Sequence, residues 1–236
     1  MAPPQEWIVH AATVQVQYER GVVFLDKAGS LMLALEDALG KPFVGNVPAM
    51  TGAELRSGPE RLLVTFGSEQ FTATQNWTDA VGRLEQVSSN AWEKLSDVLG
   101  VARHVKRFGA RYQFMFPTRT KEEAESAVAR CAVSQPTTPL RDLVGETAVR
   151  AIQYVTESPH GRLRLAIDSV EVSTNGAVAH DLVALIPEHA LHLDLDHFRV
   201  DDQDLSKGKL KDFLRHAWQQ SRTIATLIAG QIRAHS

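Results

Sequence analysis

The chain is poor in features that mark whole classes of protein. Its 236 residues include one cysteine, Cys131, so no disulfide can form within the chain. No window approaches the run of about 18 apolar residues that a membrane-spanning helix requires. The start, MAPPQEWIVH, lacks the basic segment and apolar run of a secretory signal. These absences predict a cytoplasmic protein that does not span a membrane.

Neither sign of charge dominates the sequence. There are 25 basic and 28 acidic residues, which gives a formal net charge of -3 at pH 7. Nucleic-acid-binding domains commonly carry a strongly basic balance, because they neutralise phosphates. The balance disfavours nucleic-acid binding, and any basic surface has to be local.

Familiar catalytic and cofactor motifs are also missing. The sequence has no GxSxG, no HExxH, no glycine-rich phosphate loop ending in GK[ST] and no paired CxxC. We therefore expect no cofactor, and the sequence favours a non-enzymatic role.

What the sequence does contain is alternation and helical periodicity. Strands are predicted from apolar residues that recur at every second position, and helices from spacings of three and four. We expect an α+β fold in which an antiparallel sheet packs long amphipathic helices on one face. The predicted strands are 13–25, a hairpin over 61–75, 106–117, 147–156, 162–173 and 190–200; the predicted helices are 30–40, 77–99, 120–132 and about 25 residues at the C-terminus; and 41–60 is expected to be irregular.

Residues 1–236 are predicted to form a single domain. A weak internal similarity suggests the further hypothesis of two similar halves, 1–118 and 119–236. In each half a strand pair and a linker precede a helix, and these helices contain NAW at 90–92 and HAW at 216–218.

In the stretch KRFGARYQFMFP, residues 106–117, aromatic residues occupy even positions and arginines occupy odd positions. On a strand, Phe108, Tyr112 and Phe114 share one face, while Arg107 and Arg111 share the other. Rings exposed on such a strand could stack on bases, as in RNA-binding sheets. Burial of the rings beneath amphipathic helices explains them without a ligand, and we favour that interpretation.

This stretch carries a resemblance to a known family. RFGARYQF, with the tryptophan-containing helix before it and the strand LHLDLDHF behind it, resembles a sporadically distributed bacterial family of about this length. Members carry Arg, Gly, Leu, Arg, Tyr and Asn on a strand that follows a helix. The chain keeps Gly109, Arg111 and Tyr112 and has Ala110 and Phe114 where Leu and Asn are usual. The family has no established activity, so the resemblance implies no catalytic residue.

The segment HALHLDLDH, residues 189–197, is the best candidate for metal chemistry. On a strand His192, Asp194 and Asp196 project from one face, and such side chains can bind zinc or a harder cation. Arg162 and Arg164 alternate in the same way on the preceding strand. They offer the carboxylates cross-strand partners, so a salt-bridged face is the favoured interpretation.

The leading hypothesis for function is a non-enzymatic interaction or regulatory module. It would offer its polar sheet face, or an uncovered edge, to a protein partner or to a second copy of itself. The candidate binding residues are Arg107, Arg111, Arg162 and Arg164. Two alternatives stay open: a metal-dependent hydrolase using His192, Asp194 and Asp196, and nucleic-acid binding through Arg107 and Arg111.

Overall fold

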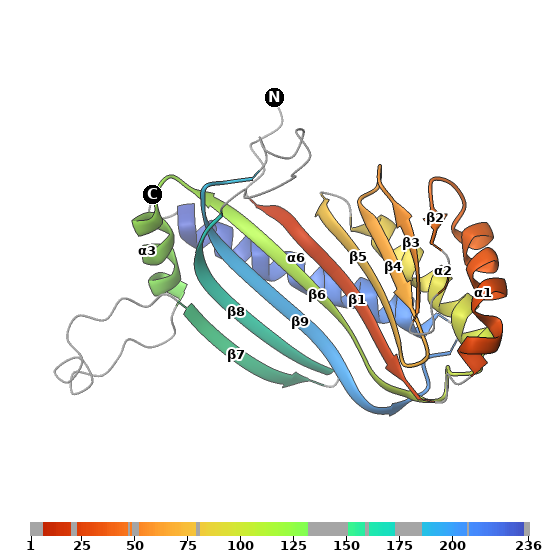
Figure 1. Ribbon diagram of the computed structural model, residues 1–236. Helices are drawn as coiled ribbons and strands as arrows, with labels where there is room; N and C mark the ends of the chain where they lie inside the picture. Colours follow the sequence, from red (N-terminus) through yellow and green to blue (C-terminus); the bar gives the residue numbers. More distant parts are fainter. Residues whose placement is uncertain are drawn as a thin grey trace.

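The protein is described by a computed structural model in which one antiparallel sheet is combined with helices (Figure 1). The described residues are 7–19, 23–46, 48, 52–78, 81–131, 151–158, 161–172, 186–206 and 208–233, without the side chains of 201–203, 231 and 233.

The sheet has nine strands in the order β2-β3-β4-β5-β1-β6-β9-β8-β7, and the pairings within it are antiparallel. Its two longest strands, β6 and β9, lie side by side near the middle (Figure 1). The predicted α+β class and the antiparallel sheet are therefore confirmed. The strands are β1 (Ile8–Tyr18), β2 (Val44–Gly45), β3 (Ala53–Ser57), β4 (Leu62–Phe66), β5 (Gln70–Thr78), β6 (Val105–Thr118), β7 (Ala151–Ser158), β8 (Gly161–Glu171) and β9 (His189–Gln203).

The helices differ in what they contact. In Figure 1, α6 runs behind the sheet, α1 and α2 lie beside the β3–β5 end, and α3 lies beside the β7–β8 end. Among the described residues, no helix is both long enough and apolar enough to cross a membrane. The helices are α1 (Phe24–Leu39), α2 (Gly82–Leu99), α3 (Lys121–Cys131) and α6 (Lys209–Arg233).

The core forms around the rings of β6. Tyr112 and Phe114 are fully buried, and both contact Trp218 of α6, with ring centroids 5.2 and 6.0 Å apart. Phe108 meets Phe213 of the same helix edge to face at 4.9 Å. These contacts confirm the prediction of a core strand. A base-stacking platform on these rings is wrong, because the rings lie beneath α6.

Several predicted boundaries are wrong. Helix α1 begins at Phe24, so Ser30 lies within it and does not cap it. The segment 41–60 contains β2 and β3, because Ala53, Leu55 and Ser57 point inward in strand alternation that its prolines and glycines obscured. β5 continues to Thr78, so the helix predicted over 77–99, α2, starts only at Gly82.

Other local predictions are confirmed. At the start of α3 the Glu123 amide donates to Thr120 Oγ1 at 3.2 Å, while the Glu123 carboxylate accepts from the Arg119 amide at 2.8 Å. These bonds satisfy helix-end amides in the manner of a capping box. Helix α6 has the predicted length of 25 residues.

Candidate functional site

Five charged side chains form an ion-pair network on the sheet face opposite the Tyr112 and Phe114 rings. Arg111 holds Asp194 with two hydrogen bonds, Nε to Oδ1 at 2.8 Å and Nη2 to Oδ2 at 2.6 Å. Asp196 receives Arg107 Nη2 at 3.2 Å and has Arg164 Nη2 at 3.9 Å. We call these residues, Arg107, Arg111, Arg164, Asp194 and Asp196, the arginine–aspartate network.

The register of three strands produces this network. Arg111 pairs with Asp196 across β6 and β9, and Asp196 pairs with Arg164 across β9 and β8. Paired residues on neighbouring strands project from the same face of the sheet. The strong Arg111 contact is diagonal, because its directly opposite neighbour is Asp196 while its hydrogen bonds go to Asp194.

Gly109 lies where β9 comes closest to β6, beside the network. Gly109 lies opposite Phe198, and a Cβ added to it would be 2.7 Å from the His197 carbonyl oxygen and 3.0 Å from Phe198 Cβ. The missing side chain therefore admits the close approach of β9. The Arg107 guanidinium then lies 4.8 Å from the centre of the Phe198 ring, in a cation–π contact.

The three arginines of the network outnumber its two carboxylates by one charge. Hydrogen bonding to Asp194 raises the pKa of Arg111. Burial raises the pKa of Asp196, while the charges of Arg107 and Arg164 act in the opposite direction. Three guanidinium groups face two carboxylates whose side chains are only 10% and 14% exposed. The predicted arginines thus stabilise the sheet face, where they are engaged by carboxylates rather than presented as a bare basic surface.

The proposed metal ligands are separated by their partners. His192 Nδ1 lies 2.9 Å from Asp168 Oδ1 on β8, while Asp194 and Asp196 bind arginines. Among the described residues, no group of three His, Cys, Asp or Glu side chains is arranged to hold a metal ion. The three predicted ligands are engaged instead by Asp168 and by the arginines of the network.

Arg162 lies outside the network. Its Nε donates to Glu157 Oε1 on β7 at 2.8 Å, and both side chains are more than half exposed. The sequence therefore predicted four arginines on one face, and the structure brings three of them together at two carboxylates and leaves the fourth near the edge of the sheet.

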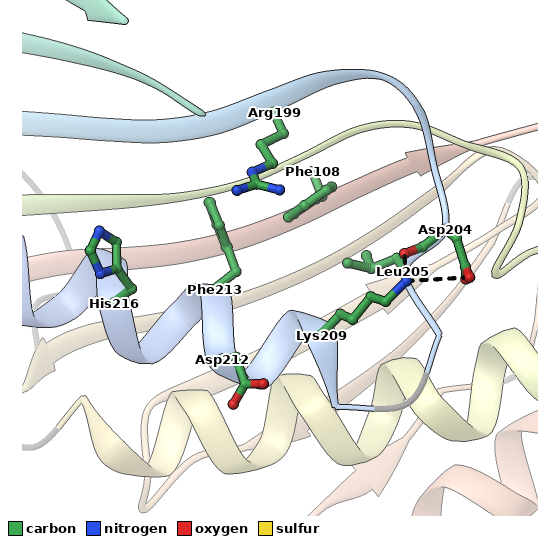
Figure 2. A pocket seen from close by; sticks show the side chains of 8 residues that line it. All are labelled: Phe108, Arg199, Asp204, Leu205, Lys209, Asp212, Phe213 and His216. Carbon is green, nitrogen blue, oxygen red and sulfur yellow. Dashed lines mark hydrogen bonds and ion pairs between the residues drawn. The ribbon is translucent and has the colours of Figure 1, made fainter. Parts of the chain in front are cut away.

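A pocket of about 480 Å³ lies at the junction between β9 and α6 (Figure 2). We call it the α6 pocket. Phe108 comes from β6 and Arg199 from β9, and α6 closes the other side. Its volume is in the range of small-molecule sites, about 300–1,000 Å³. The lining residues are Phe108, Arg199, Asp204, Leu205, Lys209, Asp212, Phe213 and His216.

The connection from β9 to α6 is held in place by specific hydrogen bonds. The Leu205 amide donates to the Ala102 carbonyl at 2.9 Å, and the Leu205 carbonyl accepts from Trp92 Nε1 at 3.0 Å. Asp204 Oδ1 accepts from the Ser206 amide at 3.0 Å, and Lys209 Nζ donates to the Asp204 carbonyl at 3.0 Å. Hydrogen bonds from Ser206 and then Lys209 lower the pKa of Asp204 to about 2. The pocket wall is therefore preformed.

Sequence reasoning missed the α6 pocket and the role of Phe198. The pocket joins residues from 108 to 216, so no local motif spans it. The available signal was the clustering of acidic and basic residues in DDQDLSKGKLKD, directly after a strand and before a helix. Phe198 fell at a position where alternation placed a polar face, and its ring is accommodated there by Gly109.

No protein-family model and no curated protein matches this chain.

Proposed function

We propose that the protein is a non-enzymatic interaction module whose partner is a second copy of the chain, bound edge to edge at β7. The observation that supports this most is the exposure of β7. Among the described residues its one neighbour in the sheet is β8, and Val155 in its middle is 61% exposed. An edge strand presents unpaired amides and carbonyls that can pair with another chain.

The two edges of the sheet differ in how well they resist pairing. The edge strand β2 has two residues, Val44 and Gly45, and Pro42 precedes it. Short strands and prolines are devices that block edge-to-edge association. β7 has eight residues, no proline and no lysine or arginine. The β7 sequence therefore lacks the proline and the basic residues that commonly block edge-to-edge pairing.

The order of elements gives a second argument. The sequence suggested halves 1–118 and 119–236; from the element order we infer instead a boundary before β6, so that a strand, a helix, a series of strands and a helix follow one another in each half. We also infer that α1, α2 and α6 form one layer against the same side of the sheet. In this arrangement β7 is the counterpart of β3. β3 is covered by β2, whereas β7 has no such extra strand among the described residues.

A second copy suits this edge because β7 is compatible with itself. Its only charged side chain is Glu157. In an antiparallel pairing centred on Tyr154, Glu157 would lie opposite Ala151 of the second copy, and Val155 opposite Gln153. No two carboxylates would meet. Such a pairing is isologous and closes as a dimer with twofold symmetry.

The arginines take different parts in this proposal. Arg162 and Arg164 lie on β8, next to the edge, and Arg162 holds Glu157 beside the proposed interface. Arg107 and Arg111 lie on β6, where they stiffen the sheet through Asp196 and Asp194. The interface is therefore expected to depend on β7 and its β8 support rather than on β6.

The test is the molar mass in solution, measured by light scattering after size exclusion over a range of protein concentrations. We expect a mass that rises with concentration toward twice the monomer mass of 26.0 kDa. Val155→Lys places a charge in the middle of the edge, opposite Arg164, and should leave only monomer.

Val155→Thr is the matched control, since it keeps a β-branched side chain without adding charge. It should associate like the original protein. Circular dichroism melting should show that both variants are folded. A chain that stays monomeric at every concentration, or a Val155→Lys variant that still dimerises, would exclude the β7 interface.

A further inference from the structure

We propose that the α6 pocket binds a small organic carboxylate with a flat apolar body. This inference is independent of association at β7, because the pocket is formed by β6, β9 and α6 and the proposed interface by β7.

The apolar part of the ligand would be held by rings. Phe108 and Phe213 meet at an interplanar angle of 76°, and Leu205 lies beside them in the pocket lining. Figure 2 shows both rings and Leu205 turned toward the same space between β6 and α6. Apolar walls of this kind bury the body of a ligand, while a few polar groups fix its orientation.

Two cations supply the polar groups. Figure 2 shows the Arg199 guanidinium at the β9 side of this space, above the Phe108 and Phe213 rings, and the Lys209 ammonium beside Asp204 in the connection from β9 to α6. A guanidinium matches a carboxylate through two parallel N–H donors. Lys209 has three N–H donors, and its bonds with Asp204 use the carbonyl and one carboxylate oxygen. A ligand carboxylate can accept from the remaining donor.

The acidic side chains of the lining select the charge of the ligand. Asp204 is ionised at neutral pH, and Asp212 also belongs to the lining, although Figure 2 shows it pointing away from the two rings. A phosphate carries close to two negative charges at this pH and would be repelled more strongly than a carboxylate. The sequence also has no glycine-rich phosphate loop. A singly charged carboxylate therefore fits better than a phosphate.

Calorimetric titration of the full chain tests the proposal with phenylacetate and its neutral analogue 2-phenylacetamide as probes. We expect phenylacetate to bind with a Kd on the order of 1 mM or tighter, as suits a ligand of this size. The neutral 2-phenylacetamide should bind about tenfold more weakly than phenylacetate, because it cannot form the charge-assisted hydrogen bonds.

Arg199→Gln should weaken phenylacetate binding by about tenfold while leaving phenylacetamide binding nearly unchanged. Arg222→Gln is the matched control, since Arg222 is exposed on α6 and is not part of the lining. Thermal melting should show that both variants are folded. Equal affinity for the two probes, unchanged phenylacetate affinity of Arg199→Gln, or absence of saturable binding would each overturn the proposal.

Discussion

His197 shows how a single residue couples the core to pH. It lies on β9, is 5% exposed, and its Nε2 is 2.8 Å from Ser221 Oγ of α6. Burial, and to a lesser extent the charge of His216, lowers the pKa of His197 to about 4. In the folded protein the neutral imidazole of His197 is therefore more stable than the protonated form at neutral pH.

This pKa predicts that stability is lost in mild acid. The unfolded chain takes up a proton at His197 near its ordinary pKa of about 6.5, whereas the folded chain does so only near 4. Above about pH 6.5 His197 is neutral in both states, so its contribution is fully present. As the pH falls toward 4, the free energy of unfolding should decrease by up to roughly 3 kcal/mol from this group.

Urea unfolding of the original protein and of His197→Gln at several pH values checks this prediction. Glutamine does not titrate, and its amide can still hydrogen-bond to Ser221. The difference in unfolding free energy between the two proteins should change by roughly 3 kcal/mol between neutral pH and pH 4. If the unfolding free energies of the two proteins changed with pH in parallel, His197 would not be the titrating group.

At the scale of elements, the junction between β9 and α6 depends on a helix from earlier in the chain. Trp92 of α2 is fully buried, contacts Tyr18 and Phe71, and donates its indole N–H to the Leu205 carbonyl. Leu205 is also one of the residues that line the α6 pocket. Helix α2 thereby positions both the start of α6 and the pocket.

Trp92→Phe should destabilise the protein by about 2–4 kcal/mol. It removes volume from the core and leaves the Leu205 carbonyl without its donor. Urea unfolding measures the loss, and hydrogen exchange should show faster opening at residues 204–206. Trp218→Phe is the comparison, because Trp218 contacts Phe114 and Tyr112 through its ring. Unchanged exchange at 204–206 in Trp92→Phe would contradict the role assigned to the indole.

At the scale of the whole molecule, one hydrophobic core cluster contains residues from both the first and the last part of the chain. The core cluster includes Val14 and Leu35 from the first part of the chain and Leu193 and Leu214 from the last. β6 connects the two parts, because it pairs with β1 on one side and with β9 on the other. The first and the last part of the chain therefore share one core and do not each have a separate one.

We therefore predict a single cooperative unfolding transition. Far-UV and near-UV circular dichroism should give the same melting curve, because secondary structure and ring packing are lost together. The separate fragments 1–118 and 119–236 should each fail to fold, since the second fragment loses β6 and with it the rings that cover α6. Two resolved transitions, or a folded fragment, would show that the halves are independent.

Local sequence patterns were sufficient to predict which face of β6 is buried and how long α6 is. Alternation in β6 assigned Phe108, Tyr112 and Phe114 to the core, and helical periodicity gave the length of α6, because both periods are set by the geometry of the backbone itself. The same reasoning failed at β2 and β3. There, short strands lie among prolines and glycines, and pairing of β3 with β4 and of β2 with β3 decides their conformation.

The sequence by itself determined that this chain is an α+β protein with rings on one face of a strand and arginines on the other. Only the tertiary structure decided that Arg111 binds Asp194, 83 residues away, that β7 is an edge, and that a pocket forms between β9 and α6. The physical reason is that alternation states which face a side chain occupies, whereas its neighbours depend on strand order and register, and these arise from pairing between distant parts of the chain.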